Sequence, residues 1–420
     1  MASDPTPHPS GQPAVIFDDG RGRLAPLTDL RAAFDVRTGA RTTFQRLVNE
    51  LDLQPIALVV PPLLAALTAE RHDLPANPRF EPTSNDEGVL LVNGRCVLPL
   101  AEIGSLEPGQ TLVDGESKDI IAHRVAPGGS IAAFFVSLYG GQTPGRPVLH
   151  ARRILLSRPW HIRTFRDEAL STDLVDMATL SFEPRLPGVT FFGEAPISIA
   201  TSARLYPGVI LDLEHGPIVI DDHAVLRPGC TLIGPCYIGP HTTVADRALI
   251  KANTSIGPWC KVAGEVGGTI FQGYANKAHD GHLGDAFVGE WVNLGAGTTN
   301  SNLLNTYGEV LARAAPASGV ERTGQTFLGC IIGDHVKTAI CTRIMTGAVI
   351  HTGAMLAATA AVEGAVPAFA WVTDDAPPGA RSFRIEKFLD VAKIVMGRRS
   401  VTANEAYLER LRLLHAQSSK

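Results

Sequence analysis

The chain has 420 residues, a formal net charge of −5 at pH 7 and a sequence pI near 6.2. This mildly acidic balance, with no run of basic residues, argues against nucleic acid as a partner. Neither the opening MASDPTPHPSGQP nor the short apolar stretch 56–67 has the composition of a signal peptide or a membrane span, so we expect a cytoplasmic protein.

Residues 14–150 have the pattern of an α/β domain. The apolar runs AVIFDD, IALVV and GVLLVNGRCVLPL predict buried strands, and TFQRLVNELD predicts a helix. Residues 151–190 are expected to connect this domain to the next and contain a second predicted helix, RDEALSTDLVDM. Strands that alternate with helices in this way favour an α/β fold.

Residues 15–28, VIFDDGRGRLAPLT, resemble the opening of sugar nucleotidyltransferases, a strand followed by GxGxRLxPLT. In that family the glycine-rich turn lets backbone N–H groups approach the nucleotide phosphates. The turn is one residue short here, and the lysine that follows it in the family is absent, so Arg31 or Arg37 is a candidate substitute. The nucleotide-binding residues that this resemblance implies are Gly20, Gly22, Arg23, Thr28 and Asn93.

Nucleotidyl transfer also requires acidic residues that hold Mg²⁺. Arg95 stands close to where the resemblance predicts a metal-binding aspartate, and Asp18 and Asp19 are the acids nearest the glycine-rich turn. The metal ligands therefore stay unassigned. The domain either transfers nucleotidyl groups with Mg²⁺, binds nucleotide without transfer, or is structural.

A six-residue repeat dominates residues 191–365. Eight apolar residues follow one another at a spacing of six: Ile220, Leu226, Leu232, Ile238, Val244, Ile250, Ile256 and Val262. A small residue lies four positions after each of the first seven: Ala224, Cys230, Cys236, Thr242, Ala248, Thr254 and Cys260. A hexapeptide repeat is the signature of a parallel β-helix, here with three flat walls per coil. We predict that the apolar residues point into the prism and that the small residues, cysteines included, fit its corners.

The repeat is interrupted twice, over 265–285 and over 301–327. The first segment concentrates polar residues where a repeat would otherwise continue. Since loops on a rigid scaffold often carry function, we expect the chemistry of this domain on these two departures.

The segment 277–303, KAHDGHLGDAFVGEWVNLGAGTTNSNL, resembles the acetyltransferase domain of the bifunctional N-acetylglucosamine-1-phosphate uridyltransferase/glucosamine-1-phosphate acetyltransferase family. A KAxH stretch, LGD and VNxGAGTxxxN follow in the family's order, and the resemblance covers residues 195–360. It implies a left-handed β-helix, a homotrimer and acetyl-CoA as the acyl donor.

Within this resemblance, His279 falls at the position of the catalytic base and Glu265 at that of the glutamate that assists it. Histidine suits the task because it accepts a proton near neutral pH. His282 replaces a substrate-contacting tyrosine, and a phosphate-binding lysine of the family is replaced by Gly267. Lys251 and Lys277 are candidate cations for the substrate phosphate.

Further contacts follow from the same resemblance. Asn293 would contact the sugar, although it could equally form an internal ladder of the β-helix. The acetyl-CoA contacts that the resemblance implies are Ala296, Gly297, Asn302, Leu303 and Ile340. With Gly295, the segment leaves a wall without side-chain bulk, along which a cofactor could lie.

Residues 383–418 carry apolar residues at helical spacing. The pattern breaks near Gly397, and Thr402 is the expected cap of the second helix. We expect these helices to pack on the end of the prism.

The leading hypothesis is an enzyme of nucleotide-sugar biosynthesis, as in the formation of UDP-N-acetylglucosamine. The β-helix would acetylate an amino-sugar phosphate, and the N-terminal domain would join a sugar 1-phosphate to a nucleotide by uridylyl-type transfer. One alternative is a nucleotidyltransferase whose β-helix serves only oligomerisation or regulation, and another is a non-catalytic scaffold. A zinc-dependent β-helix carbonic anhydrase would need His335 beside His279 and His282.

Overall fold

The computed structural model describes residues 11–81, 86, 88–178 and 186–418. The chain divides into two compact units. The first unit comprises Met1–Leu24, Leu30–Val36 and Arg41–Arg158, and the second comprises Ala25–Asp29, Arg37–Ala40 and Pro159–Lys420. No helix among the described residues is long and apolar enough to cross a membrane.

A six-stranded mixed sheet forms the first unit, in the order β2-β1-β3-β5-β4-β6. The strands are β1 (Gln12–Phe17), β2 (Leu53–Val59), β3 (Leu90–Asn93), β4 (Gln110–Asp114), β5 (Ile120–Arg124) and β6 (Arg146–His150). The helical segments are η1 (Ala33–Asp35), α1 (Thr43–Glu50), η2 (Pro62–Leu64), α2 (Ala65–Arg71), α3 (Ala101–Gly104) and α4 (Ile131–Tyr139). The predicted strands and the predicted helix are all present, which confirms the α/β class.

Local sequence explains how these elements begin and pack. Thr42 and Gln45 form a reciprocal capping box that starts α1. Phe17 of β1 meets Phe134 and Phe135 of α4 edge to face, with ring centroids 5.5 and 5.7 Å apart. The sheet is therefore held to α4 on the side where β1 ends.

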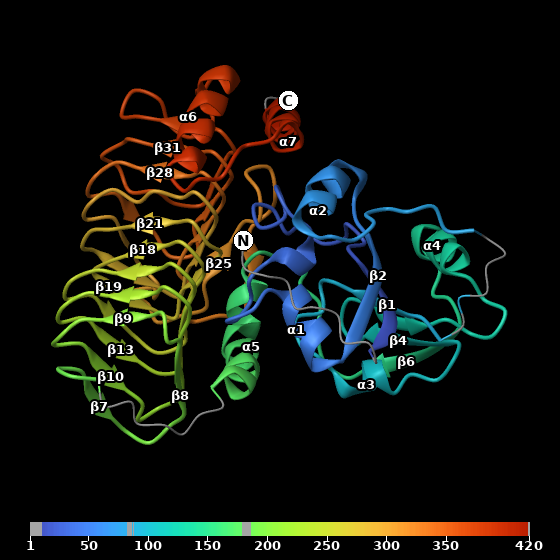
Figure 1. The fold of residues 1–420 in the computed structure, drawn as a ribbon. Coiled ribbons are helices and arrows are strands. Elements are labelled where there is room, and N and C mark those ends of the chain that lie inside the picture. The colour runs from blue at the N-terminus through green and yellow to red at the C-terminus, as the bar shows by residue number, and fades with distance from the viewer. Residues whose placement is uncertain (1–10, 82–85, 87, 179–185, 419–420) are drawn as a thin grey trace. The chain divides into compact units, whose positions relative to one another are not determined.

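The second unit contains the predicted left-handed β-helix, whose short strands stack from β7 towards β31 in Figure 1. The first wall contains β7 (Thr190–Phe192), β10 (Ile210–Asp212), β13 (Thr231–Ile233), β16 (Leu249–Ile250), β19 (Glu265–Gly267) and β22 (His282–Gly284), followed by the pair β24 (Thr299–Asn300) and β29 (Arg343–Ile344). The second wall contains β8 (Ile197–Ile199), β11 (Ile218–Ile220), β14 (Cys236–Ile238), β17 (Thr254–Ile256), β20 (Ile270–Phe271), β23 (Phe287–Val288), β27 (Ile331–Ile332), β30 (Val349–Ile350) and β32 (Ala365–Val366). The third wall contains β9 (Arg204–Leu205), β12 (Val225–Leu226), β15 (Thr243–Val244), β18 (Lys261–Val262) and β21 (Asn276–Lys277), and then β28 (Lys337–Thr338), β31 (Met355–Leu356) and β33 (Trp371–Val372). The strands thus continue past residue 365, where the sequence placed the end of this domain.

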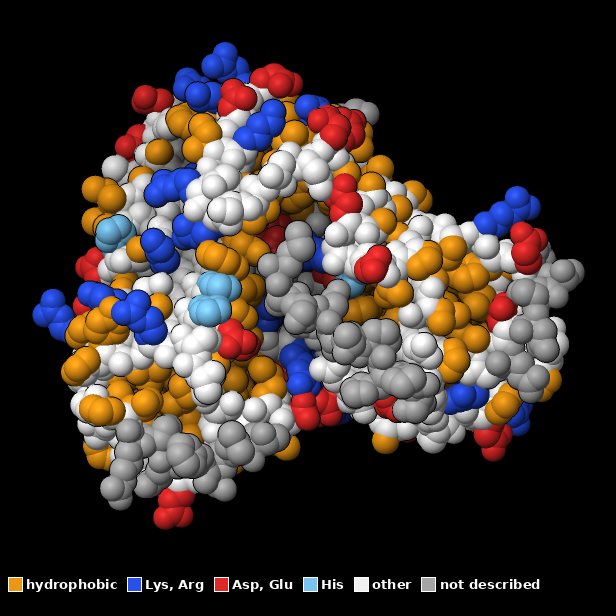
Figure 2. Space-filling model, viewed as in Figure 1, with side chains coloured by type: hydrophobic (Ala, Val, Ile, Leu, Met, Phe, Trp, Pro, Cys, Tyr) orange, Lys and Arg blue, Asp and Glu red, His pale blue; other side chains and the backbone are white. Residues whose placement is uncertain are grey.

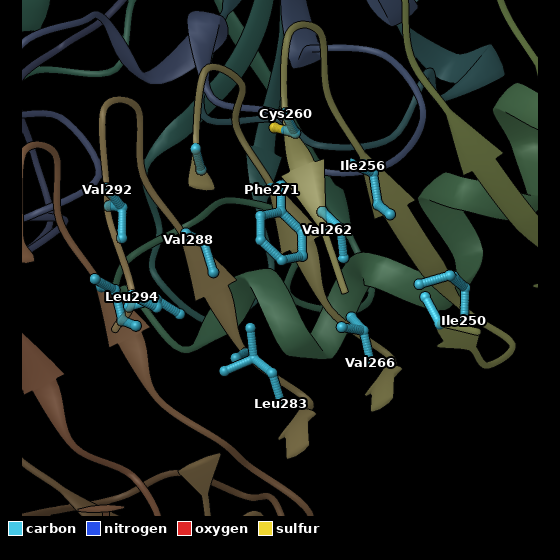
Figure 3. Close-up of a cluster of buried hydrophobic side chains, with 14 of the residues drawn as sticks. Ile250, Ile256, Cys260, Val262, Val266, Phe271, Leu283, Val288, Val292 and Leu294 are labelled. Atoms are coloured by element: carbon cyan, nitrogen blue, oxygen red, sulfur yellow. The ribbon is translucent and has the colours of Figure 1, made fainter. Parts of the chain in front are cut away.

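The hexad residues fill the prism as predicted. Ile250, Ile256 and Val262 come from the first, second and third walls in turn, and their side chains point into a common core (Figure 3). The small residues between them, including Cys230, Cys236 and Cys260, are buried. Each cysteine is free, which agrees with a packing role at the corners.

The prediction that the chain departs from the prism over residues 265–285 is wrong. Residues 265–285 continue the three walls as β19, β20, β21 and β22. Ile256 pairs with Phe271 and Val262 pairs with Lys277, so this coil has fewer residues in its turns but keeps its strands. The six-residue spacing is lost because the turns are shorter. Each strand still places a side chain inside the prism.

The second expected departure is confirmed. After β24 the chain leaves the prism and forms a hairpin of β25 (Leu311–Ala312) and β26 (Glu321–Arg322), which pair antiparallel. Val310, Ala312, Ala314 and Leu328 bury apolar surface against Trp160. The hairpin is therefore anchored by its own small apolar cluster.

Three helices complete the second unit. Leu170 and Leu174 of α5 (His161–Met177) pack on Val219 and Tyr237 of the second wall. α6 (Ile385–Gly397) and α7 (Glu405–Ser418) confirm the predicted break near Gly397. The predicted cap is wrong, because the side chain of Asn404, not Thr402, accepts a hydrogen bond from the Tyr407 amide at 2.9 Å.

Aromatic rings are stacked along the corner between the second and third walls, and we call them the corner ladder. Its members are His223, His241, Trp259, Tyr274, Trp291 and His335, which all have positive φ angles. His241 stacks on Trp259 with centroids 4.2 Å apart, and Tyr274 stacks on Trp291 at 4.4 Å. The C-terminal helices pack on this corner, where Tyr407 of α7 forms a 2.7 Å hydrogen bond with His335.

Candidate functional site

Three polar side chains meet on the outer face of the first wall. Parallel pairing sets Glu265 of β19 beside His282 of β22. The Glu265 Oε1 atom lies 3.4 Å from the His282 Nδ1 atom and forms a short ion pair with the Lys251 ammonium. Hydrogen bonding from Lys251 lowers the pKa of Glu265, so the glutamate is held in its charged form.

Lys251 compensates for the absent side chain at Gly267. A Cβ at position 267 would lie 3.2 Å from the Lys251 Cβ and 3.3 Å from its Cδ. The aliphatic stem of Lys251 therefore crosses the place of the lysine that the resemblance led us to expect. The cation is supplied by the residue that directly follows β16 of the same wall.

His279 makes no contact with Glu265 among the described residues, contrary to the predicted pairing. It is exposed in the turn between β21 and β22. Within the part of the chain that the structure describes, no hydrogen bond or ion pair joins His279 to Glu265. The register of β19 and β22 gives Glu265 a different histidine, His282.

Lys277 points into the prism, so it does not face a substrate as expected. Its side chain is 2% exposed, and its ammonium donates to the backbone oxygens of Ala263 at 2.8 Å and His279 at 3.0 Å. Burial lowers its pKa to about 8. Lys277 therefore holds the turn that carries His279.

Asn302 and His282 converge on a small space above Gly284. A Cβ at position 284 would lie 2.7 Å from the His282 Nε2 atom and 2.9 Å from the Asn302 Nδ2 atom. Asn302 Nδ2 donates to Asp285 Oδ2 at 2.8 Å, which leaves its second hydrogen free to face a ligand. His282 and Asn302 thus place one imidazole and one amide donor together over Gly284, and we call this group the cradle.

Two arginines that the sequence did not single out hold the edge of this cradle. Arg163 and Arg166 of α5 form ion pairs with Asp285 at 2.9 and 2.7 Å. Asp285 belongs to the LGD motif, but nothing in the sequence pattern connects it to a helix more than a hundred residues earlier.

The glycines of the GAG segment serve coil stacking, which corrects the expected open wall. A Cβ at Gly295 would lie 2.5 Å from the Ala339 backbone oxygen, and Gly297 has a φ of +72° beside the Cys341 sulfur. Ala296 accepts a backbone hydrogen bond from Cys341 at 2.6 Å. These three positions are therefore packed against the next coil of the same chain.

The remaining predicted contacts are dispersed. Leu303 forms a β-bridge with Phe327 at the base of the hairpin, and Ile340 is 72% exposed. Asn293 bridges Asn276 and Lys337 on the outer face of the third wall. The predicted internal ladder is wrong, because Asn293 is exposed and the Asn276 amide donates to its side chain on the outer face at 2.7 Å. Asn293 thus lies on a different wall from Glu265.

A cleft of about 520 Å³ lies at the ends of β1 and β2 in the first unit. Gly20 and the carboxylates Asp18 and Asp19 are on its rim, and its other walls are mostly apolar. Asp18 accepts hydrogen bonds from the amides of Gly20 at 2.9 Å and Ala33 at 2.8 Å, and burial raises its pKa. The cleft lies beside the glycine-rich turn and is large enough for a nucleoside-sized ligand.

The other residues predicted to bind nucleotide contact other parts of the chain or belong to the second unit. A Cβ at Gly22 would lie 3.1 Å from the Ser157 Cα, and the Arg23 amide donates to the Ser157 oxygen at 3.0 Å. Thr28 belongs to the second unit. Arg37 does too, and its guanidinium donates to the backbone oxygen of Gln272 at 3.2 Å.

The residues at the expected Mg²⁺ site do not fit a magnesium ion. Arg95 is fully buried and donates two hydrogen bonds to Asp19, at 2.8 and 2.7 Å, and one to Asp119 at 2.7 Å. Asn93 donates to the same Asp19 carboxylate at 2.9 Å. A guanidinium therefore already neutralises the carboxylates that a metal would require. Across the described residues, no group of three or more His, Cys, Asp or Glu side chains could hold a metal ion.

The residues of the zinc alternative do not come together either. His335 is buried in the corner ladder and bonded to Tyr407, between the second and third walls. His282 is on the first wall, so the three histidines of the carbonic anhydrase hypothesis do not meet.

Comparisons with known proteins give one family model and a set of partial relatives. Residues 14–179 match the family model described as sugar nucleotidyl transferase. Bifunctional protein GlmU of Rippkaea orientalis is 33% identical over 106 residues, which is 25% of this chain and 22% of the relative. Bifunctional protein GlmU of an Exiguobacterium species is 27% identical over 195 residues, or 40% of this chain and 39% of the relative. The chain thus spans less than half the length of these curated relatives.

Among solved structures, a hexapeptide transferase family protein from Anaplasma phagocytophilum is 14% identical. That match covers 53% of this chain and 95% of the other, with a TM-score of 0.22.

Proposed function

We propose that the chain is a divergent GlmU-like transferase and that its second unit transfers an acetyl group from acetyl-CoA to an amino-sugar phosphate. The observation that carries this proposal is the convergence of His282 and Asn302 on the space above Gly284, with Glu265 behind the histidine. A base and an amide donor on either side of a cradle are what amide formation from a thioester requires.

The roles follow from the contacts. Glu265 faces Nδ1 of His282 and keeps that ring oriented, so Nε2 can accept the proton that leaves the attacking amine. Asn302 donates a hydrogen bond towards the acyl oxygen. Acetyl-CoA supplies the acyl carbon and the sulfur that departs when the N–C bond forms and the C–S bond breaks. Lys251 faces the substrate phosphate from the same wall.

The geometry favours His282 over His279 as the base. The resemblance assigns this role to His279, but the glutamate contacts His282. His279 lies in the turn before β22 and His282 is the first residue of β22, so each can be replaced separately.

The test compares acetyl transfer to glucosamine 1-phosphate in His282→Ala, His279→Ala and Glu265→Gln, with the exposed His215→Ala as the control. We expect His282→Ala to lower kcat about 10²-fold or more, with little change in His279→Ala. Glu265→Gln combined with His282→Ala should be no worse than His282→Ala alone, because the pair acts as a unit. A loss confined to His279→Ala would return the base to that residue. No transfer by the wild-type protein, with this or other amino-sugar phosphates, would contradict the proposal.

For the first unit, we propose binding of a nucleotide or nucleotide sugar in the cleft beside Gly20, without Mg²⁺ at Arg95. Supporting this are the glycine-rich turn and the size of the cleft, while the buried Arg95 argues against metal-dependent transfer. Titration of the protein with UDP in the presence of Mg²⁺ or EDTA tests it. We expect equal affinity in both, and binding that depends on Mg²⁺ would restore nucleotidyl transfer as the leading interpretation. The homotrimer and the cytoplasmic location also stay proposals.

A further inference from the structure

Asp285 lies between two arginines of α5 and the amide of Asn302, and its two carboxylate oxygens have different partners. The Oδ1 atom faces the guanidinium groups of Arg163 at 2.9 Å and of Arg166 at 2.7 Å. The Oδ2 atom accepts a hydrogen bond from the Nδ2 atom of Asn302 at 2.8 Å. The carboxylate thus connects a helix outside the prism to one side of the cradle.

The two arginines have fixed positions on α5. Arg163 and Arg166 are three residues apart, so they lie on the same face of the helix. Lys and Arg side chains are usually at the surface, as those visible in Figure 2 are, but Arg166 is only 3% exposed and donates to the backbone oxygen of Gly268. A Cβ at position 268 would lie 2.5 Å from the Arg166 Nη1 atom, so this glycine leaves room for the guanidinium. Leu170 and Leu174 pack the rest of the helix against the second wall.

Attachment of α5 to the prism accounts for only part of this arrangement. An ion pair between helix and prism requires one carboxylate oxygen, and Oδ1 of Asp285 receives both arginines. The Oδ2 atom is left for Asn302. Asp167 of α5 offers the same two arginines a second carboxylate, 2.7 Å from Arg166 and 3.5 Å from Arg163. No hydrogen bond or ion pair joins Asp167 to Asn302 among the described residues, so only Asp285 connects the arginines to the cradle.

The polarity of these groups decides which side of the Asn302 amide faces the carboxylate. A guanidinium only donates hydrogen bonds and a carboxylate only accepts them, whereas an amide has one donating side and one accepting side. Because Oδ2 of Asp285 only accepts, it pairs with the NH2 group of Asn302 and not with its oxygen. The Nδ2 atom of the same NH2 group borders the space above Gly284, so its second hydrogen is available to a ligand in the cradle.

We propose that Asp285 is a positioning residue: held by Arg163 and Arg166, it orients the Asn302 amide so that the NH2 group faces the acyl oxygen of the thioester. This inference rests on the proposed function, in which Asn302 donates a hydrogen bond to that oxygen. A fixed donor stabilises the negative charge that develops on the acyl oxygen in the transition state. An amide that turns over would present its own oxygen there and repel that charge. Asp285 itself does not touch the substrate in this role.

The variant that tests this role is Asp285→Asn, because it keeps the size of the side chain and removes its charge. The arginines can pair only with the amide oxygen at position 285, so the new NH2 group turns towards Asn302. Asn302 then accepts with its oxygen, and its NH2 group no longer faces the acyl oxygen. For acetyl transfer we expect kcat to fall about 10²-fold, the cost of removing one such donor, while the KM for acetyl-CoA changes little.

Two comparisons separate positioning from a merely structural role. Asp167→Asn changes the other carboxylate partner of the same arginines, so it is the matched control and should leave kcat unchanged. Asn302→Ala should lower kcat about as much as Asp285→Asn, and the double variant should lower it no further, since both changes remove the same hydrogen bond. Losses that multiply in the double variant, or full kcat in Asp285→Asn, would overturn the proposal.

A binding measurement tests the same role without turnover. Calorimetric titration of the full chain compares acetyl-CoA with S-ethyl-CoA, a thioether that lacks the acyl oxygen. We expect the wild type to bind acetyl-CoA about fivefold more tightly, the worth of one hydrogen bond. Asp285→Asn should abolish this preference, and Asp167→Asn should keep it.

The two readouts distinguish failure of this inference from failure of the proposed function. A preference for acetyl-CoA that is lost in Asp285→Asn supports the positioning role even if the wild type transfers no acetyl group to an amino-sugar phosphate, a result that would contradict the proposed function alone. Equal affinity for the two ligands in the wild type, or a preference that survives in Asp285→Asn, would overturn the positioning role. Absence of acetyl-CoA binding by the wild type would overturn both.

Discussion

The guanidinium of Arg95 is the most constrained charge in the first unit. It and the side chain of Asp19 are both fully buried, and Asp119 and Asn93 complete the cluster. Burial alone would raise the pKa of Asp19, but the charge and hydrogen bonds of Arg95 outweigh it and the pKa is lowered. Removing one partner from such a pair leaves an uncompensated charge.

Arg95→Met should therefore destabilise the protein by about 3–5 kcal/mol. Arg146→Met, which removes an exposed ion pair with Glu107, is the control and should cost less than about 1 kcal/mol. Urea unfolding followed by circular dichroism measures both. A small effect for Arg95→Met would mean that the buried cluster is hydrated or rearranges.

Lys277 makes the free energy of unfolding rise with pH in the alkaline range. Its pKa is about 8 in the folded chain, against an ordinary value of 10.5, because burial disfavours the charged form. Between these values the unfolded chain binds the proton and the folded chain does not, so the free energy of unfolding rises with pH. Lys337 contributes a slope of the same sign.

Lys277→Met should remove about half of this rise between pH 8 and pH 10. Chemical unfolding at several pH values in that window, compared with the wild type, gives the slope. An unchanged slope in Lys277→Met would show that the ammonium is solvated in the folded state.

At the scale of elements, the sequence predicted the three walls of the β-helix correctly but not the pairing of the candidate site residues. The hexad identifies inward positions because each coil repeats the same three strands, and Ile250, Ile256 and Val262 lie as expected. It failed over 265–285, where shortened turns alter the spacing without ending the strands. It also could not give the pairing of Glu265, since the partner depends on how many residues the coil contains.

Glycines at coil corners offer a test at this scale. In Gly295→Ala the added Cβ would lie 2.5 Å from the Ala339 oxygen, so we expect a loss of about 1–3 kcal/mol from overpacking. Gly319→Ala, in the hairpin with open space around it, should change stability by less than about 0.5 kcal/mol. Thermal or urea unfolding distinguishes them, and equal effects would contradict a stacking role for Gly295.

At the scale of the whole molecule, the proposed trimer bears on residues that look unfavourable in a single chain. Ile340 is 72% exposed on the prism, where an apolar side chain gains nothing from water. In a monomer, a charged side chain at so exposed a position would hardly change the free energy of unfolding. Between subunits, the same charge would be buried and would weaken their association.

Light scattering should therefore give a mass of three times the 44.6 kDa of the chain, and Ile340→Asp should lower it. A wild-type mass equal to one chain would contradict the trimer. A trimer that survives Ile340→Asp unchanged would place the subunit contacts elsewhere on the prism.

The corner ladder has a consequence for how such a chain can change over time. Trp291 and His335 stay in ring contact, with centroids 6.3 Å apart, although the whole hairpin lies between them in sequence. The alignment of successive coils is therefore kept by the stacked rings and does not require a fixed number of residues per coil. New segments can enter between coils without shifting those above or below, so the scaffold can acquire insertions of varied length while its repeating frame stays intact.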